Sequence, residues 1–172
     1  TCPVCVWWPI LQLQGALAAT QPERMLTLTG LPETTLVAQR AVRAYARNLR
    51  ERGVQGMYVF ERHDSGALHA HAYVHGTRLR LPALEGAKPL AIAGAVNVVE
   101  FPRGRFHAQG YLFKGAKCEE TLVQHLADNN GRLVFLTTRR FFRDTATGEV
   151  YAGTRAACKA ERGRYTARGQ RS

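Results

Sequence analysis

The 172-residue chain is basic: 24 lysine and arginine residues oppose 13 aspartate and glutamate residues, which gives a formal net charge of +11. Hydrophobic residues make up 45% of the chain and charged residues 22%, a composition that excludes an intrinsically disordered protein. No apolar run reaches the roughly 20 residues of a membrane-spanning helix, so we expect no membrane association. Arginine is far commoner than lysine, and its forked guanidinium group suits phosphate, so the expected partner is a polyanion.

The first 22 residues are expected to be an N-terminal extension that precedes the regular fold. No basic segment opens their apolar stretch at residues 6–19, so a signal peptide is not predicted. Cys2 and Cys5 have the spacing of half a zinc site, which would need the distant Cys118 and Cys158, or an upstream half, to hold Zn²⁺. Four cysteines do not indicate a disulfide scaffold, so we expect a cytoplasmic protein.

The regular fold is expected to begin with a strand at residues 24–29, where apolar residues and threonines alternate. A helix is predicted from the threonine pair at 34–35 to Arg52, with Gly53 as its C-cap. Apolar residues recur within it at helical spacing, so one face is apolar and the other is basic. The basic face carries Arg40, Arg43, Arg47 and Arg50.

The next two strands are predicted as a hairpin with turn residues at 63–66. The predicted segments are strands at 54–62 and 68–75, an irregular connection over 76–94, a strand at 95–101, helices at 105–117 and 119–130, and a strand at 133–138. A turn at 144–149 and a mobile basic tail then close the chain. This order predicts an α+β fold with a central antiparallel sheet of about five strands, in a domain at residues 23–153 followed by the tail at 154–172.

Two histidines at alternate positions of the third predicted strand are the clearest candidates for chemistry. Residues two apart in a strand project from the same face, so His69 and His71 point the same way. Adjacent imidazoles repel each other when protonated, and a divalent metal is the usual reason for such a placement. The alternative is a solvated pair on an exposed strand face.

Glu61 on the preceding strand would complete a metal site if the hairpin register places it on the face of the histidines. Two imidazoles and one carboxylate form a mixed site with open positions, suited to Mn²⁺ or Mg²⁺ holding a phosphate oxygen. The alternative is that Glu61 forms a surface ion pair with Arg62 or Arg78.

A Tyr-x-x-Lys pattern follows later in the chain. On a helix, Tyr111 and Lys114 would share a face. A phenolate can attack phosphorus and form a phosphotyrosine, and a nearby ammonium group would stabilise the developing negative charge. The alternative is a core tyrosine. His107, one turn earlier, and His75, at the end of the third strand, are expected to be solvated.

These motifs, taken in chain order, resemble those of the HUH endonuclease superfamily, and in particular its single-tyrosine rolling-circle replication initiators. Residues 69–71 match the two histidines flanking a hydrophobic residue that name the superfamily. Residues 25–29 resemble its earlier strand motif, and residues 111–114 match its later Tyr-x-x-Lys motif. Glu61 falls where several such initiators have a third metal ligand. The resemblance covers about residues 24–117.

The resemblance implies an RNA-recognition-like sheet and a single-stranded DNA substrate at a replication origin. It also implies nicking and rejoining through a 5′-phosphotyrosyl intermediate, with Tyr111 and Lys114 as catalytic residues and one Mn²⁺ or Mg²⁺ as cofactor. A host helicase or polymerase would be a further partner of such a phage or plasmid protein. The residues expected to contact DNA are Thr27, Thr29, Arg40, Arg43, Arg47 and Arg50.

Two alternatives stay open. A single-tyrosine HUH transposase would perform related chemistry, but we would expect glutamine at the position of Lys114. A non-catalytic basic nucleic-acid-binding domain would need no metal, and its histidine pair would be incidental.

Overall fold

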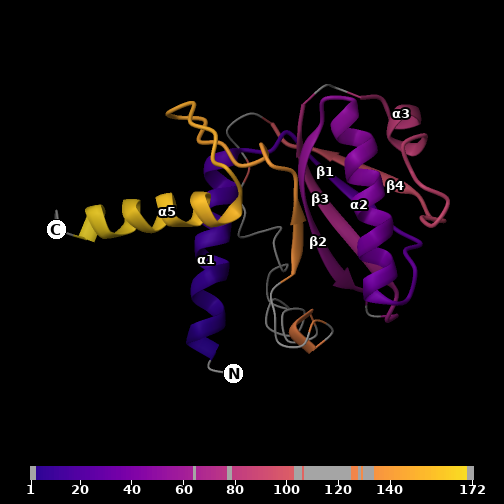
Figure 1. The fold of residues 1–172 in the computed structure, drawn as a ribbon, viewed down its shortest axis with the longest axis horizontal. Coiled ribbons are helices and arrows are strands. Elements are labelled where there is room, and N and C mark those ends of the chain that lie inside the picture. The colour runs from indigo at the N-terminus through magenta and orange to yellow at the C-terminus, as the bar shows by residue number, and fades with distance from the viewer. Residues whose placement is uncertain are drawn as a thin grey trace.

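The structure, a computed structural model, is an α+β fold: a five-stranded antiparallel sheet with helices packed on it (Figure 1). It describes residues 3–63, 65–76, 79–102, 106, 125–127, 129 and 134–169, and their side chains between residues 10 and 164. The strand order is β4-β1-β3-β2-β5. The strands are β1 (Arg24–Leu28), β2 (Gln55–Arg62), β3 (Leu68–His75), β4 (Val96–Glu100) and β5 (Phe135–Thr137). All five were predicted, with ends that differ by at most two residues.

Helices cover both faces of this sheet. Figure 1 shows α1 on one side of the strands and α2 on the other. The described helices are α1 (Pro3–Thr20), α2 (Thr35–Glu51), α3 (Leu81–Glu85) and α5 (Thr154–Gly169). Among the described residues, none of these helices combines the length and apolar character required to cross a bilayer.

The face of the sheet beneath α2, called the α2 face, holds one hydrophobic core. Helix α2 begins after Thr34 and ends before Gly53, whose positive φ of 84° is the left-handed conformation that favours glycine after a helix. Its predicted apolar stripe is buried against alternate residues of the strands, as period-two side-chain alternation requires. This core includes Ala38, Val42, Tyr45, Leu49, Leu26, Leu28, Tyr58, Phe60, Ala70 and Ala72.

The opposite face, called the α1 face, holds a second core, and here the prediction of an N-terminal extension was wrong. Residues 3–20 are helical, and Ile10, Leu13 and Leu17 are at most 1% exposed. Their spacing of three and four residues is a helical stripe, which the flanking prolines and glutamines obscured. The stripe packs against Met25, Met57, Val59, Tyr73, Phe141 and Phe142.

The expected mobile basic tail is also a helix, α5, which crosses α1 (Figure 1). Ala157 is buried in the core of the α1 face, and the side chain of Glu161 lies against Gly15 of α1, so close that a Cβ there would come within 2.6 Å of Glu161 Cγ. Arg164 donates to the carboxylates of Asp144 and Glu161. These contacts hold α5 against the domain, and they join residues far apart in the sequence, which local composition does not indicate.

The described connections agree with those predicted from the sequence. Among the described residues of 76–94, the regular element is the short helix α3. The predicted turn at 144–149 is closed by a hydrogen bond from Asp144 N to Glu149 O of 2.8 Å. Of the helices predicted at 105–117 and 119–130, residues 106, 125–127 and 129 are described; 125–127 are helical, whereas 106 and 129 are not. The remainder lies outside the described residues.

The packing of α1 yields a stability prediction. Leu13→Ala should lower the free energy of unfolding by about 2–5 kcal/mol, because it leaves a cavity where a side chain 1% exposed is removed. Leu11→Ala on the same helix is the matched control, since Leu11 is 44% exposed and should cost less than about 1 kcal/mol. Urea denaturation measures both; equal costs would contradict the docking of α1.

Candidate metal centre

The pairing of β2 with β3 brings the predicted metal ligands together. Glu61 lies directly opposite His69 in the register, and Val59 lies opposite His71. Facing residues of an antiparallel pair project from the same side, so the condition placed on Glu61 is met. All three side chains lie on the α1 face and are buried, with exposures of 6%, 8% and 2% for Glu61, His69 and His71.

The nitrogen and oxygen atoms of this group converge on one point. His69 Nε2 and His71 Nε2 are 3.2 Å apart, and Glu61 Oε2 lies 3.8 Å from the first and 3.6 Å from the second. A triangle with these sides has a centre about 2.1 Å from each corner, which is the usual metal–ligand distance for imidazole nitrogen and carboxylate oxygen. The donor chemistry fits equally well, so the group of Glu61, His69 and His71 can hold a metal ion.

The geometry of β2 disfavours the alternative ion pair between Glu61 and Arg62. Neighbouring residues of a strand face opposite ways, and the Arg62 guanidinium donates instead to the carbonyl of Gly66 in the hairpin turn, at 2.8 Å. Arg78 lies outside the described residues. The Glu61 carboxylate is therefore turned toward the two imidazoles and away from Arg62.

Thr27, predicted to contact DNA, lies beside His71 of the candidate metal centre. Its register partner is His71, and its hydroxyl oxygen lies 3.1 Å from His71 Nδ1. With Nδ1 protonated, His71 donates to this oxygen and presents the lone pair of Nε2 to the centre of the group. Such partners orient a ligating imidazole and select its tautomer. The alternation of threonine with apolar residues in β1 indicated this position, because it places the Thr27 hydroxyl on the face of the sheet that carries His71.

Thr29, the other threonine expected to contact DNA, closes the end of β1. Its hydroxyl donates to the Ala95 carbonyl at 3.2 Å and accepts from the Ala95 N–H at 3.0 Å. Its side chain is half-buried just beyond the end of β1.

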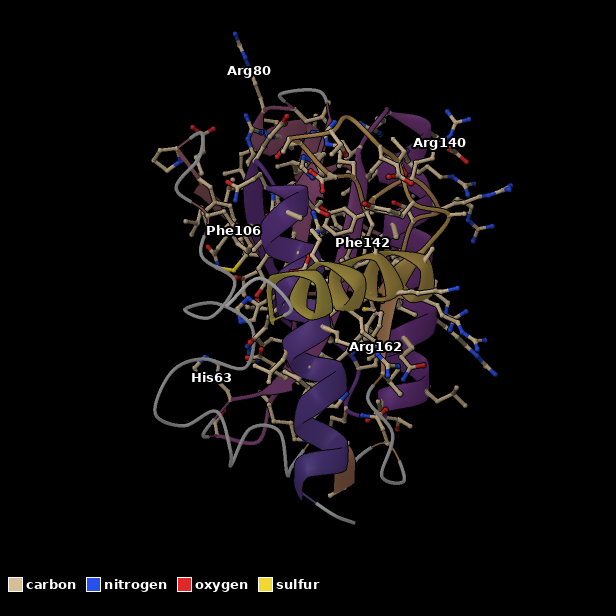
Figure 2. All side chains as sticks on the ribbon, turned by 90° about the vertical axis from the view of Figure 1, so that its left-hand side faces the viewer. His63, Arg80, Phe106, Arg140, Phe142 and Arg162 are labelled. Atoms are coloured by element: carbon tan, nitrogen blue, oxygen red, sulfur yellow. The ribbon has the colours of Figure 1, made fainter. Side chains whose placement is uncertain are left out.

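His63 extends the group toward solvent. It follows Glu61 by two residues and is exposed, and its ring centroid lies 5.2 Å from that of His69. Figure 2 shows it at the hairpin end of the molecule. The solvent-facing side of the metal centre is therefore the side of the β2–β3 turn.

His75 was expected to be solvated, and that prediction was wrong. It is 4% exposed, and its Nδ1 accepts a hydrogen bond of 2.6 Å from the Arg143 guanidinium. Burial, and then the positive charge of Arg143, lower the pKa of His75 from 6.5 to about 3. His75 is thus a neutral core residue at physiological pH. Its position at the end of β3 predicted a solvated side chain, because its partner Arg143 comes from a distant segment.

Three tyrosines of the described chain are buried in its two cores. Tyr45, Tyr58 and Tyr73 are fully buried, and Tyr73 packs edge-on against Phe106 with ring centroids 5.8 Å apart. Tyr73 shares the face of the histidines, yet a substrate could not reach its hydroxyl. Tyr111, Lys114 and His107 lie outside the described residues, so their roles stay predictions.

The possible zinc site at the N-terminus also stays a prediction. Cys2 and Cys118 lie outside the described residues, and only the backbone of Cys5 is described. Cys158 is half-buried against the core of the α1 face, where burial and the charge of Glu161 raise the pKa of its thiol to about 11. This thiol is therefore protonated and packs as an apolar side chain.

The four arginines predicted on the outer face of α2 are all exposed there. Because α2 covers the sheet face opposite the histidines, these residues and the metal centre lie on different sides of the sheet (Figure 1).

Comparison with known proteins adds no relative: no family model, curated protein or solved structure matches the chain. The resemblance to the HUH superfamily rests on the motifs alone.

Metal binding is directly testable. Mn²⁺ at about 100 times its dissociation constant should raise the free energy of unfolding by about 2.7 kcal/mol. Glu61→Gln and His71→Gln should each abolish most of this gain, because each removes one converging ligand. His75→Gln, a change at a buried histidine of the same strand face, is the matched control and should keep it. Denaturation with and without Mn²⁺ measures the gain, and an unchanged gain in His71→Gln would exclude the site.

The low pKa of His75 predicts a pH dependence of stability. The unfolded imidazole takes up a proton near pH 6.5 whereas the folded one does so only near pH 3, so acidification favours the unfolded chain. Stability should fall by up to about 1.4 kcal/mol per pH unit between these values and be fully present above them. His75→Gln, which keeps an acceptor for Arg143 but cannot titrate there, should flatten this part of the curve. Unfolding free energies at several pH values for parent and variant give the difference.

Proposed function

We propose that this protein is a metal-dependent endonuclease that nicks and rejoins single-stranded DNA through a tyrosine, as in the initiation of rolling-circle replication. The observation that carries the proposal is the convergence of Glu61, His69 and His71 on one face of an antiparallel sheet. In the sequence this group is followed by the Tyr-x-x-Lys pattern at residues 111–114 and accompanied by a net charge of +11. A buried carboxylate beside two imidazoles is costly without a function, which favours a metal-dependent activity over a purely structural role.

The proposed reaction is a phosphodiester exchange. The Tyr111 oxygen, after losing its proton, attacks phosphorus; the bond from phosphorus to the 3′ oxygen breaks, and that oxygen leaves as a hydroxyl after taking up a proton. The DNA 5′ phosphate is then linked to the tyrosine, and attack by a 3′ hydroxyl reverses the step and rejoins the strand. Lys114 would stabilise negative charge on the reacting oxygens.

The metal centre would supply a divalent positive charge to the scissile phosphate when it is loaded. Mn²⁺ or Mg²⁺ is the proposed ion, since a mixed nitrogen and oxygen set with open positions suits phosphate chemistry, and the imidazoles favour Mn²⁺ over Mg²⁺. Thr27 would hold His71 in the tautomer that binds metal, and His63 would border the entrance by which DNA reaches the ion.

The burial of Tyr45, Tyr58 and Tyr73 disfavours these three as the nucleophile and so supports Tyr111. Tyr45 and Tyr58 belong to the core of the α2 face, away from the metal centre, and Tyr73 is 0% exposed. Tyr111 is the tyrosine whose neighbour three residues on is a lysine.

Two other functions are compatible with the same features. A transposase of the same chemical class is disfavoured by Lys114, where we would expect glutamine. A non-catalytic nucleic-acid-binding domain would not require the three converging ligands, and binding without metal-dependent cleavage would support it.

The role of Tyr111 as the nucleophile can be tested by removing its hydroxyl group. Tyr111→Phe removes only the attacking oxygen, so this variant with Mn²⁺ and a mixed pool of single-stranded oligonucleotides should form no covalent adduct while the parent protein does. Tyr73→Phe is the matched control and should form the adduct, since its hydroxyl is buried. Lys114→Ala should react more slowly, by roughly 10- to 1000-fold, as expected for the loss of one charge-stabilising group.

Denaturing gel electrophoresis detects the adduct, and peptide mapping identifies the modified residue. A nucleotide found on a tyrosine other than Tyr111 would reassign the nucleophile. No adduct and no cleavage with any divalent metal would reject the proposed activity.

A further inference from the structure

The arginines of this chain fall into two kinds. Arg24 is paired with Glu100 at 3.1 Å, Arg164 with Asp144 and Glu161, and Arg143 with His75, so these side chains serve the fold. Other arginines are exposed and form no ion pair with any carboxylate in the described part of the chain. Six of these make up the second set: Arg40, Arg43, Arg47 and Arg50 of α2, and Arg139 and Arg140 directly after β5.

The second set gathers along one edge of the sheet. Figure 2 shows Arg140 at this edge, among side chains whose nitrogen-bearing ends project away from the strands. Between α2 and β5 lies a groove of about 580 Å³, and Arg43, Arg47, Arg50 and Arg139 line it. Four unpaired positive charges around one groove repel each other, an arrangement that favours a bound polyanion.

The groove offers no exposed aromatic platform for bases. Tyr58 and Leu136 are register partners and face the groove, but Tyr58 is 0% exposed. Phe135 pairs with Val59, and its side chain therefore belongs to the opposite face. Binders of single strands stack bases on exposed aromatic rings. The two aromatic residues that line this groove, Tyr58 and Phe135, are buried and half-buried, so neither offers an exposed ring.

The spacing of the arginines suits a regular row of phosphates. Residues 43, 47 and 50 are separated by four and three positions, so their side chains emerge on one side of α2. They span about 10.5 Å along the helix axis, which equals the axial length of about three base pairs of duplex. A duplex presents its phosphates outward and keeps its bases inside, so charge without stacking is sufficient to bind it.

We propose that the groove between α2 and β5 binds the phosphate backbone of double-stranded DNA, independently of the metal centre. The groove and the metal centre lie on different faces of the sheet, so one molecule can hold a duplex and a single strand at the same time. The assignment of DNA as partner rests on the proposed function. The groove would hold the duplex that flanks the strand to be cut, and its contacts would be insensitive to sequence.

The test compares two triple variants of equal charge. The groove variant carries Arg43→Gln, Arg47→Gln and Arg50→Gln; glutamine keeps the helix because it is a good helix former. The control carries Arg80→Gln, Arg155→Gln and Lys159→Gln, three exposed residues outside the groove. Both lose three positive charges, so any difference between them reports position and not net charge. Circular dichroism checks that both remain folded.

Binding is measured by fluorescence anisotropy with a blunt duplex of about 20 base pairs between about 50 and 200 mM salt, in EDTA. The groove variant should lose at least about tenfold in duplex affinity, and its salt dependence should be shallower by about 2 to 3 in the log–log slope. The control should lose less than about threefold. The single variant Arg47→Gln should reduce the slope by about 1, which gives a second reading with a minimal change.

Two outcomes would overturn the proposal: equal losses in groove and control variants, or a single-stranded oligonucleotide that loses as much affinity as the duplex. An acidic peptide of equal charge that binds as tightly as the duplex would also overturn it, because a protein partner would then fit the groove. Since EDTA removes metal, these results do not depend on nicking. Adduct formation by the parent protein with Mn²⁺ is measured separately, so a failure of the nuclease proposal would be recognised on its own.

Discussion

The antiparallel ladder between β2 and β3 is the constraint on which the metal centre depends. Eight successive residue pairs define its register, from Gln55 opposite His75 to Arg62 opposite Leu68. A slip of one residue would turn Glu61 to the other face of the sheet, because side chains alternate with period two. The register is held by burial on both faces, since each face contributes alternate residues of β3 to a separate hydrophobic core.

This arrangement places polar groups where the chain would otherwise favour apolar ones. Glu61, His69 and His71 continue the row of Met57, Val59 and Tyr73 on the α1 face, and all are buried. A carboxylate and two imidazoles in such surroundings need mutual contacts or an ion to offset the loss of hydration. The hydroxyl of Thr27 meets part of that need at His71. Along this face of β2 and β3, the side chains therefore change from apolar core residues to polar candidate ligands toward the hairpin turn.

Local patterns were sufficient to predict the sheet and the convergence of Glu61, His69 and His71. Alternation located the strands, the histidine spacing indicated a shared face, and the hairpin turn brought Glu61 opposite His69. What local patterns could not provide was long-range pairing. The burial of His75 depends on Arg143, which is 68 residues away, and the role of Thr27 depends on a partner 44 residues away. Helices α1 and α5 were missed for the same reason, because their apolar residues find partners at the other end of the chain.

The contact between α1 and α5 joins segments that precede and follow the sheet. Glu161 lies against Gly15, and Asp144 holds Arg164 beside the same helix. During synthesis α1 leaves the ribosome before any strand, and its outer side finds α5 only after the whole sheet has emerged. Until α5 has emerged, the side of α1 that contacts α5 stays uncovered, a delay expected of a contact between segments so far apart in sequence. The core of the α1 face, which is the face of the histidines, is therefore complete only when residues from both ends of the described chain have met.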